Sequence, residues 1–169
     1  PPAVHERTML HLALSSVEKR LELEPGSTEL LFQQAALTEN TGRISEGRDL
    51  YLSLLDRDPF HAGALNNLGN LLMTVKEMPR ARGFLELAVE RHPLHLPSRA
   101  NLGNLLIKSG ELAAACEQFE AALRIDPNYR PGHAGLSFAL GDLVGAESAA
   151  WHRRRAFAGR AFVITPYRG

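Results

Sequence analysis

The chain has 169 residues, of which 44% are hydrophobic and 22% charged, an ordinary soluble composition with enough apolar residues to bury a core. Basic and acidic residues number 19 each, and this zero formal net charge argues against nucleic acid as the main partner, because phosphate binding needs a basic surface. No apolar run approaches the roughly 20 residues that cross a bilayer, and the N-terminus lacks the pattern of a signal peptide.

Two further features of composition bear on the setting. Cys116 is the only cysteine, so no internal disulfide can form, which fits a reducing compartment. Arginine outnumbers lysine by 16 to 3, which favours a GC-rich bacterial genome. We therefore expect a cytoplasmic, bacterial protein that does not enter a membrane.

Apolar periodicity, with proline and glycine as breaks, predicts an all-helical chain. Pro79 is expected in the first turn of its helix, where its missing N–H costs nothing. Gly42 and Gly110 are expected in turns that need a positive φ. The predicted helices cover residues 5–23, 28–40, 44–57, 62–75, 79–92, 96–109, 112–125, 130–141 and 145–158.

A 34-residue repeat runs through the chain. Proline recurs at this interval at Pro25, Pro59, Pro93 and Pro127, after the similar segments LELEP, LDRDP, VERHP and LRIDP. Each proline follows the end of a helix that it cannot continue. Such repeats indicate hairpins that bury their apolar faces by stacking.

The same register aligns small and large side chains. Small residues would let two antiparallel helices approach, and bulky ones would fill the space beside that contact. Three aligned positions carry this pattern: Ala35, Gly69, Gly103 and Ser137; Ala13, Gly47, Ala81, Ala115 and Ala149; and the bulky Tyr51, Leu85 and Phe119.

This pattern resembles the tetratricopeptide repeat, with Leu-Gly in the first helix, then Ala and a bulky residue in the second, then Pro. The resemblance implies a right-handed α-solenoid over residues 1–158. Its repeats would be 28–61, 62–95 and 96–129, with a partial one at 5–27 and a degenerate one at 130–158. Residues 159–169 would form an extended tail or begin a further domain, because residues 161–167 resemble a strand.

The first helices of such a solenoid line its concave side, and two of them carry the related segments NNLGNLL and ANLGNLL. The positions expected to be exposed there are Asn66, Asn67, Asn70, Met73 and Thr74, then Ala100, Asn101, Asn104, Ile107 and Lys108. Amides can donate to and accept from the backbone of an extended peptide.

Asn67, Asn70, Asn101 and Asn104 are similar to the asparagine ladder in the repeats of O-linked N-acetylglucosamine transferases. The resemblance implies peptide binding through these residues, with Asn66, Met73 and Lys108 beside them. The alternative is that the asparagines bond neighbouring repeats or water. The basic clamp of chaperone-binding relatives is not matched, because Phe32, Ala36, Ala134 and Phe138 occupy its positions.

Other candidate sites favour structural interpretations. His92 and His95 flank Pro93 without the further ligands of a metal site, so we expect solvated turn residues. Cys116 is expected to be a buried, inert thiol. The basic-aromatic run from Trp151 to Arg155 is more typical of a solvated end helix than of an anion site.

The sequence thus predicts a scaffold that binds a protein or an extended peptide, with no catalytic residues, cofactor or metal. Two alternatives stay open. The chain could be the recruiting arm of a larger enzyme such as a glycosyltransferase. It could also be a self-assembly module that forms homo-oligomers through its end repeats or its C-terminal strand.

Overall fold

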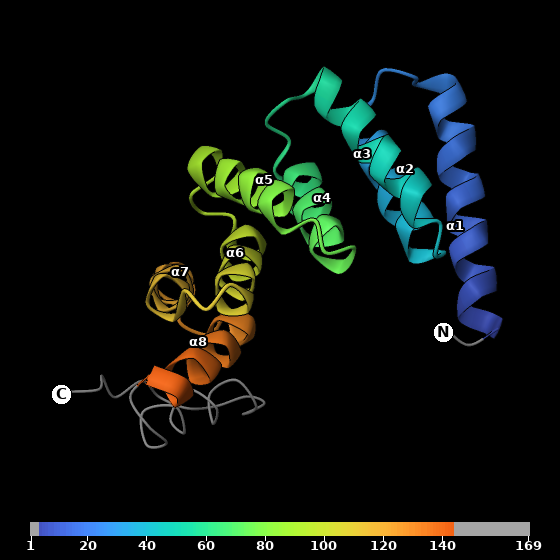
Figure 1. Cartoon of the computed structure of the whole chain (residues 1–169). Helices are drawn as coiled ribbons and strands as arrows, with labels where there is room; N and C mark the ends of the chain where they lie inside the picture. Colours follow the sequence, from blue (N-terminus) through green and yellow to red (C-terminus); the bar gives the residue numbers. More distant parts are fainter. Residues whose placement is uncertain (1–3, 144–169) are drawn as a thin grey trace. The chain divides into compact units, whose positions relative to one another are not determined.

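The computed structural model describes residues 4–143, and every regular element among them is an α-helix (Figure 1). The helices are α1 (Val4–Leu23), α2 (Thr28–Asn40), α3 (Ile44–Arg57), α4 (Ala62–Thr74), α5 (Met78–Arg91), α6 (Leu96–Lys108), α7 (Leu112–Ile125) and α8 (Arg130–Leu143).

These bounds confirm the predicted helices to within two residues at every end in the described region. Pro79 lies in the first turn of α5, as expected. The helices form hairpins in which α2 lies beside α3 and α4 beside α5 (Figure 1). The predicted helix 145–158, the tail and the run from Trp151 to Arg155 lie outside the described residues.

The turns between successive hairpins repeat one hydrogen-bond pattern every 34 residues. The residue that ends each second helix donates its N–H back into that helix, as in Asp58 to Leu54 and Asp126 to Ala122. Its carbonyl then accepts from the residue three positions later, as in His61 to Asp58 and Tyr129 to Asp126. The proline period therefore corresponds to a repeated backbone turn.

The turns inside the hairpins share a positive φ at positions that are also 34 residues apart. Gly42 has a φ of 90° and Gly110 one of 78°, which confirms the expectation for both. Lys76 occupies the same position with a φ of 65°. A side chain with a Cβ is strained in this conformation, so Lys76 is the unfavourable member of the set.

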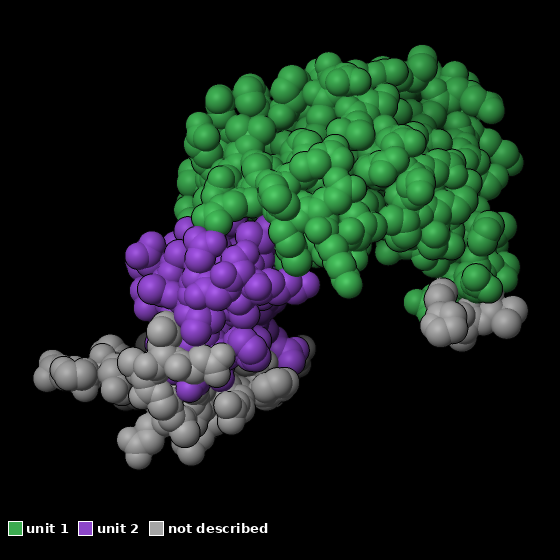
Figure 2. Space-filling view, viewed as in Figure 1, with its two compact units in different colours: residues 1–101 green, residues 102–169 purple. Residues whose placement is uncertain are grey.

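The chain forms two compact units, Pro1–Asn101 and Leu102–Gly169, divided within α6 (Figure 2). In the first unit, Tyr51, Leu54 and Leu68 are completely buried. In the second unit, Phe119 is completely buried and Leu136 nearly so.

Small residues do face bulky ones, as the register predicts. In the first unit, a Cβ on Gly69 would lie 2.6 Å from Leu85 Cγ. In the second, a Cβ on Gly103 would lie 2.6 Å from Phe119 Cζ. Gly135 contacts the same ring even more closely, at 2.1 Å for a built Cβ. Phe119 is therefore enclosed by two glycines, one from each neighbouring first helix.

Candidate functional site

A strip of polar side chains runs along the first helices at positions spaced by three and four residues, so that they share one face. In α4 the strip consists of Asn67, which is half-buried, and the exposed Asn70 and Thr74. The corresponding residues of α6 are the half-buried Asn101 and the exposed Asn104 and Lys108. Ile107 is half-buried beside them. Asn101 belongs to the first unit, and the other three belong to the second.

Three residues expected on this exposed strip are buried instead. Asn66 is 7% exposed, Met73 5% and Ala100 4%. A first helix is enclosed by its neighbours on several sides, so only a narrow line of its positions reaches solvent. The expected exposure of Met73 is wrong for this reason, and Asn66 has a role inside the protein.

Asn66 lies in a chain of side-chain hydrogen bonds within the first unit. The Asn101 amide donates to Asn66 Oδ1, and the Asn66 amide donates to Asn67 Oδ1, each over 3.0 Å. The Asn67 amide donates to Tyr51 Oη over 3.0 Å, and Tyr51 Oη donates to Glu39 Oε2 over 3.0 Å. Four helices, α2, α3, α4 and α6, are joined in this way.

This series of hydrogen bonds alters the role that we predicted for the asparagines. The idea of a ladder of four free amides is not supported, because Asn67 and Asn101 already bond to residues of their own unit. Each still has a second amide hydrogen, since one amide carries two donors. Asn70, by contrast, is exposed and makes no side-chain hydrogen bond within the described residues.

Glu39 is the last acceptor in this series of hydrogen bonds and the only charged residue in it. Desolvation raises the pKa of the Glu39 carboxyl above its ordinary value, and the hydrogen bond from Tyr51 partly opposes that rise. Burial likewise raises the pKa of the Tyr51 hydroxyl, so it stays protonated and remains a donor to Glu39.

Two aromatic contacts support this site from α2. The Phe32 ring lies 6.2 Å from the Tyr51 ring and 5.0 Å from the His61 ring, tilted in both cases. His61 also accepts the Ala64 N–H through Nδ1 at the start of α4. Phe32 therefore contacts both the Tyr51 ring and the start of α4, the helix that carries Asn67.

His92 and His95 make hydrogen bonds within the protein rather than being the solvated turn residues we expected. His92 Nε2 donates to the Phe60 carbonyl of the preceding turn, and His95 Nδ1 is hydrogen-bonded to Ser98 Oγ over 2.7 Å. Both rings are half-buried. Among the described residues, no group of three or more His, Cys, Asp or Glu residues is placed to hold a metal ion.

Cys116 is buried, as predicted, and burial raises the pKa of its thiol. A raised pKa keeps the thiol protonated and lowers its reactivity. Within residues 4–143, no helix is both long and apolar enough to cross a membrane.

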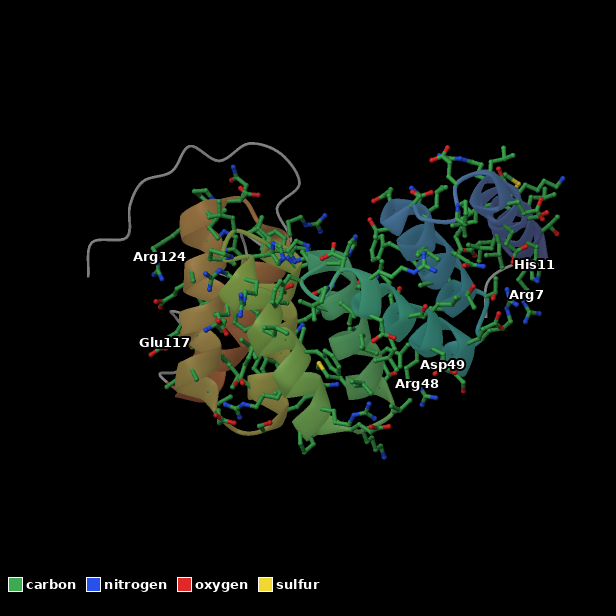
Figure 3. All side chains as sticks on the ribbon, turned by 90° about the horizontal axis from the view of Figure 1, so that it is seen from above. Arg7, His11, Arg48, Asp49, Glu117 and Arg124 are labelled. Atoms are coloured by element: carbon green, nitrogen blue, oxygen red, sulfur yellow. The ribbon has the colours of Figure 1, made fainter. Side chains whose placement is uncertain are left out.

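Charged side chains lie mainly on the second helices, away from the polar strip. Figure 3 shows Arg48 and Asp49 of α3, and Glu117 and Arg124 of α7, pointing outward from the ribbon. Arg48 and Asp49 pair with each other over 3.1 Å. The strip residues of α4 and α6 are uncharged apart from Lys108, which belongs to the second unit.

Sequence reasoning did not identify Glu39 or the hydroxyl of Tyr51 as parts of the site. The available signal was the tyrosine itself, since the other two residues at its aligned position, Leu85 and Phe119, are purely apolar. A buried tyrosine hydroxyl needs hydrogen-bond partners, and its ring reaches first-helix residues before and after it in the chain.

Comparison with known proteins agrees with this architecture. Two models of the tetratricopeptide repeat match residues 38–95 and 99–129, together more than half of the chain. No curated protein sequence gives a significant match.

Several solved structures have a similar fold. MamA 41-end from Desulfovibrio magneticus RS-1 is 22% identical and superposes with a TM-score of 0.72, covering 89% of this chain and 85% of that one. A second MamA crystal structure is 19% identical with a TM-score of 0.72, covering 92% and 94% of the two chains. At these identities the likeness concerns the fold alone.

Tetratricopeptide repeats are protein-interaction folds and typically lack catalytic activity of their own. The helices, the 34-residue turns and the two matched segments agree in register. The chain therefore belongs to the tetratricopeptide-repeat family and is a protein-interaction scaffold module.

Proposed function

We propose that this scaffold binds an extended peptide segment along the polar strip of its first helices, without catalysing a reaction. The observation that carries the proposal is the fixed row formed by Asn67, Asn70 and Asn101 in the first unit. An extended peptide presents N–H and C=O groups at regular intervals, and amides of this kind can satisfy both.

The hydrogen-bond chain prepares this row for binding. Asn67 and Asn101 are held by Tyr51 and Asn66, so their remaining donors have defined directions before a ligand arrives. A preformed site loses less conformational entropy on binding than a mobile one. Asn70 then adds an amide that is not engaged by the described part of the protein.

The experiment selects a peptide by display on the protein and titrates it against variants. Asn70→Ala should weaken binding about threefold to tenfold without changing the unfolding midpoint, because one neutral hydrogen bond contributes about 0.5–1.5 kcal/mol. The double variant Asn67→Ala and Asn101→Ala should lose tenfold or more. Asn128→Ala, in a turn of the second unit, serves as the control.

Equal affinities for Asn70→Ala, the double variant and the parent would show that peptides bind elsewhere. Asn104 and Lys108 provide the corresponding exposed side chains of the second unit, and their alanine variants test whether that unit contributes.

We also infer a cytoplasmic, bacterial setting from composition, because the single cysteine is a buried free thiol and arginine greatly outnumbers lysine. Light scattering at several concentrations tests for homo-oligomers.

A further inference from the structure

Glu39 is the one described glutamate of the first unit that is half-buried and yet has no cationic partner among the described residues. Three more accessible glutamates of this unit pair with arginines: Glu46 with Arg43 over 3.2 Å, Glu77 with Arg80 over 2.6 Å and Glu86 with Arg82 over 2.7 Å. The half-buried Glu39 receives only the hydroxyl of Tyr51, on Oε2. Its other oxygen, Oε1, has no hydrogen-bond partner within residues 4–143.

The basic residue nearest to Glu39 in sequence, Arg43, does not pair with its carboxylate. Arg43 follows α2 by three residues, but its guanidinium bonds to Glu46 and to the Thr41 hydroxyl instead. A carboxylate that is partly removed from water without a cation is unfavourable, and one neutral hydroxyl offsets only part of that cost. The raised pKa of Glu39 has the same physical origin.

The carboxylate is nevertheless held in place. Tyr51 belongs to a second helix, α3, yet its hydroxyl bonds to both Glu39 of α2 and Asn67 of α4, two first helices. Glu39 therefore lies on the side of the first unit that carries the polar strip. From Asn101 onward, each side chain donates a hydrogen bond to the next one in the series. The Glu39 carboxylate is therefore the final acceptor.

We propose that Glu39 is a specificity-determining residue that takes a lysine or arginine side chain of the bound peptide. This inference rests on the proposed function, since it assigns a ligand preference to the same strip. A cation on Glu39 would compensate the desolvated charge, and Oε1 is available as its acceptor. The hydrogen-bond chain fixes where that cation must be relative to Asn67, so the preference applies to one position of the peptide.

The test uses three pools of degenerate dodecapeptides that differ only in a fixed central residue, which is lysine, norleucine or glutamate. Each fluorescently labelled pool is titrated with the parent protein and with Glu39→Gln, which keeps the size of the side chain and an acceptor for Tyr51. Glu86→Gln removes the same charge from the opposite helix layer and serves as the matched control. Circular dichroism verifies that each variant is folded.

We expect the parent and Glu86→Gln to bind the lysine pool about tenfold more tightly than the norleucine pool, with the glutamate pool weakest. Glu39→Gln should bind the lysine and norleucine pools equally while retaining the parent's affinity for norleucine. This preference should fall as salt rises.

Two results overturn the inference and leave peptide binding intact: a parent without preference for lysine, or a Glu39→Gln variant that keeps it. The norleucine pool reports peptide binding regardless of charge. If the parent binds none of the pools, the proposed function fails and the inference falls with it.

Discussion

The hydroxyl of Tyr51 and the side-chain amide of Asn67 lie 3.0 Å apart, although they belong to successive repeats and are 16 positions apart in sequence. This bond lies at the boundary between the two hairpins of the first unit, and the same hydroxyl continues to Glu39 within the earlier hairpin. Tyr51 therefore joins contacts within a repeat to contacts between repeats.

Replacing Tyr51 with phenylalanine should lower the free energy of unfolding by about 0.5–1.5 kcal/mol, because Asn67 and Glu39 each lose a hydrogen-bond partner. Urea denaturation measures this change. A double-mutant cycle with Asn67→Ala should be non-additive, since the two side chains share one bond. Tyr129→Phe is the control, because the Tyr129 hydroxyl makes no hydrogen bond within the described residues. Additive effects would mean that the bond contributes nothing.

Enlarging either glycine against Phe119 should destabilise the fold. Gly103→Leu is expected to cost about 1–3 kcal/mol through overpacking, and Ala115→Leu a similar amount at the buried position of α7. Gly135→Ala should also be unfavourable, because its Cβ would overlap the ring. Gly83→Ala provides the contrast, since that site in α5 has open space, and it should stabilise by about 0.5–1 kcal/mol. Thermal unfolding of the four variants tests this order.

Lys76→Gly should stabilise the protein. The lysine has a φ of 65° at a position where the other hairpin turns use glycine. Relief of this strain should stabilise the folded state by more than glycine's added flexibility stabilises the unfolded state. The net rise in the free energy of unfolding is expected to be about 0.5–1 kcal/mol. The reverse change, Gly110→Ala, should be destabilising. A lower midpoint for Lys76→Gly in urea would show that the lysine is not strained.

His95 should make stability depend on pH. Burial, with the positive charges of His92 and His61, lowers the pKa of His95 in the folded protein below its ordinary value of 6.5. The unfolded chain then binds a proton at this histidine more readily than the folded protein does. The stability that the neutral His95 side chain contributes is therefore complete above pH 6.5 and is lost as pH falls below it. Urea midpoints between pH 8 and 5 should decline less in His95→Asn than in the parent.

The repeat register was sufficient to predict nearly all of the described fold. The prolines and the two turn glycines fixed the helix ends, because these residues act on the backbone locally. Packing of Gly103 against Phe119 could also be predicted from the sequence, because small and large residues recur at fixed intervals. Gly135 was missed, because its repeat departs from the pattern of the others.

The site was harder to predict because exposure depends on neighbouring helices. Asn66 and Asn67 are adjacent and chemically identical, yet only Asn67 borders the exposed strip. Met73 is buried although its position was expected to be exposed. The bond between Tyr51 and Glu39 spans 12 residues and joins a second helix to the end of a first helix. No local pattern of residues specifies that contact.

The fit between bulky residues and the next repeat gives the repeats a fixed order. Asn67 and Gly135 occupy the same aligned position, but Asn67 bonds to the polar tip of Tyr51 and Gly135 leaves room for the ring of Phe119. Exchanging these two repeats would place an amide against an apolar ring and leave a tyrosine hydroxyl without its donor. Repeats of equal length are therefore not interchangeable here, and substitutions at positions 119 and 135 should change together during evolution.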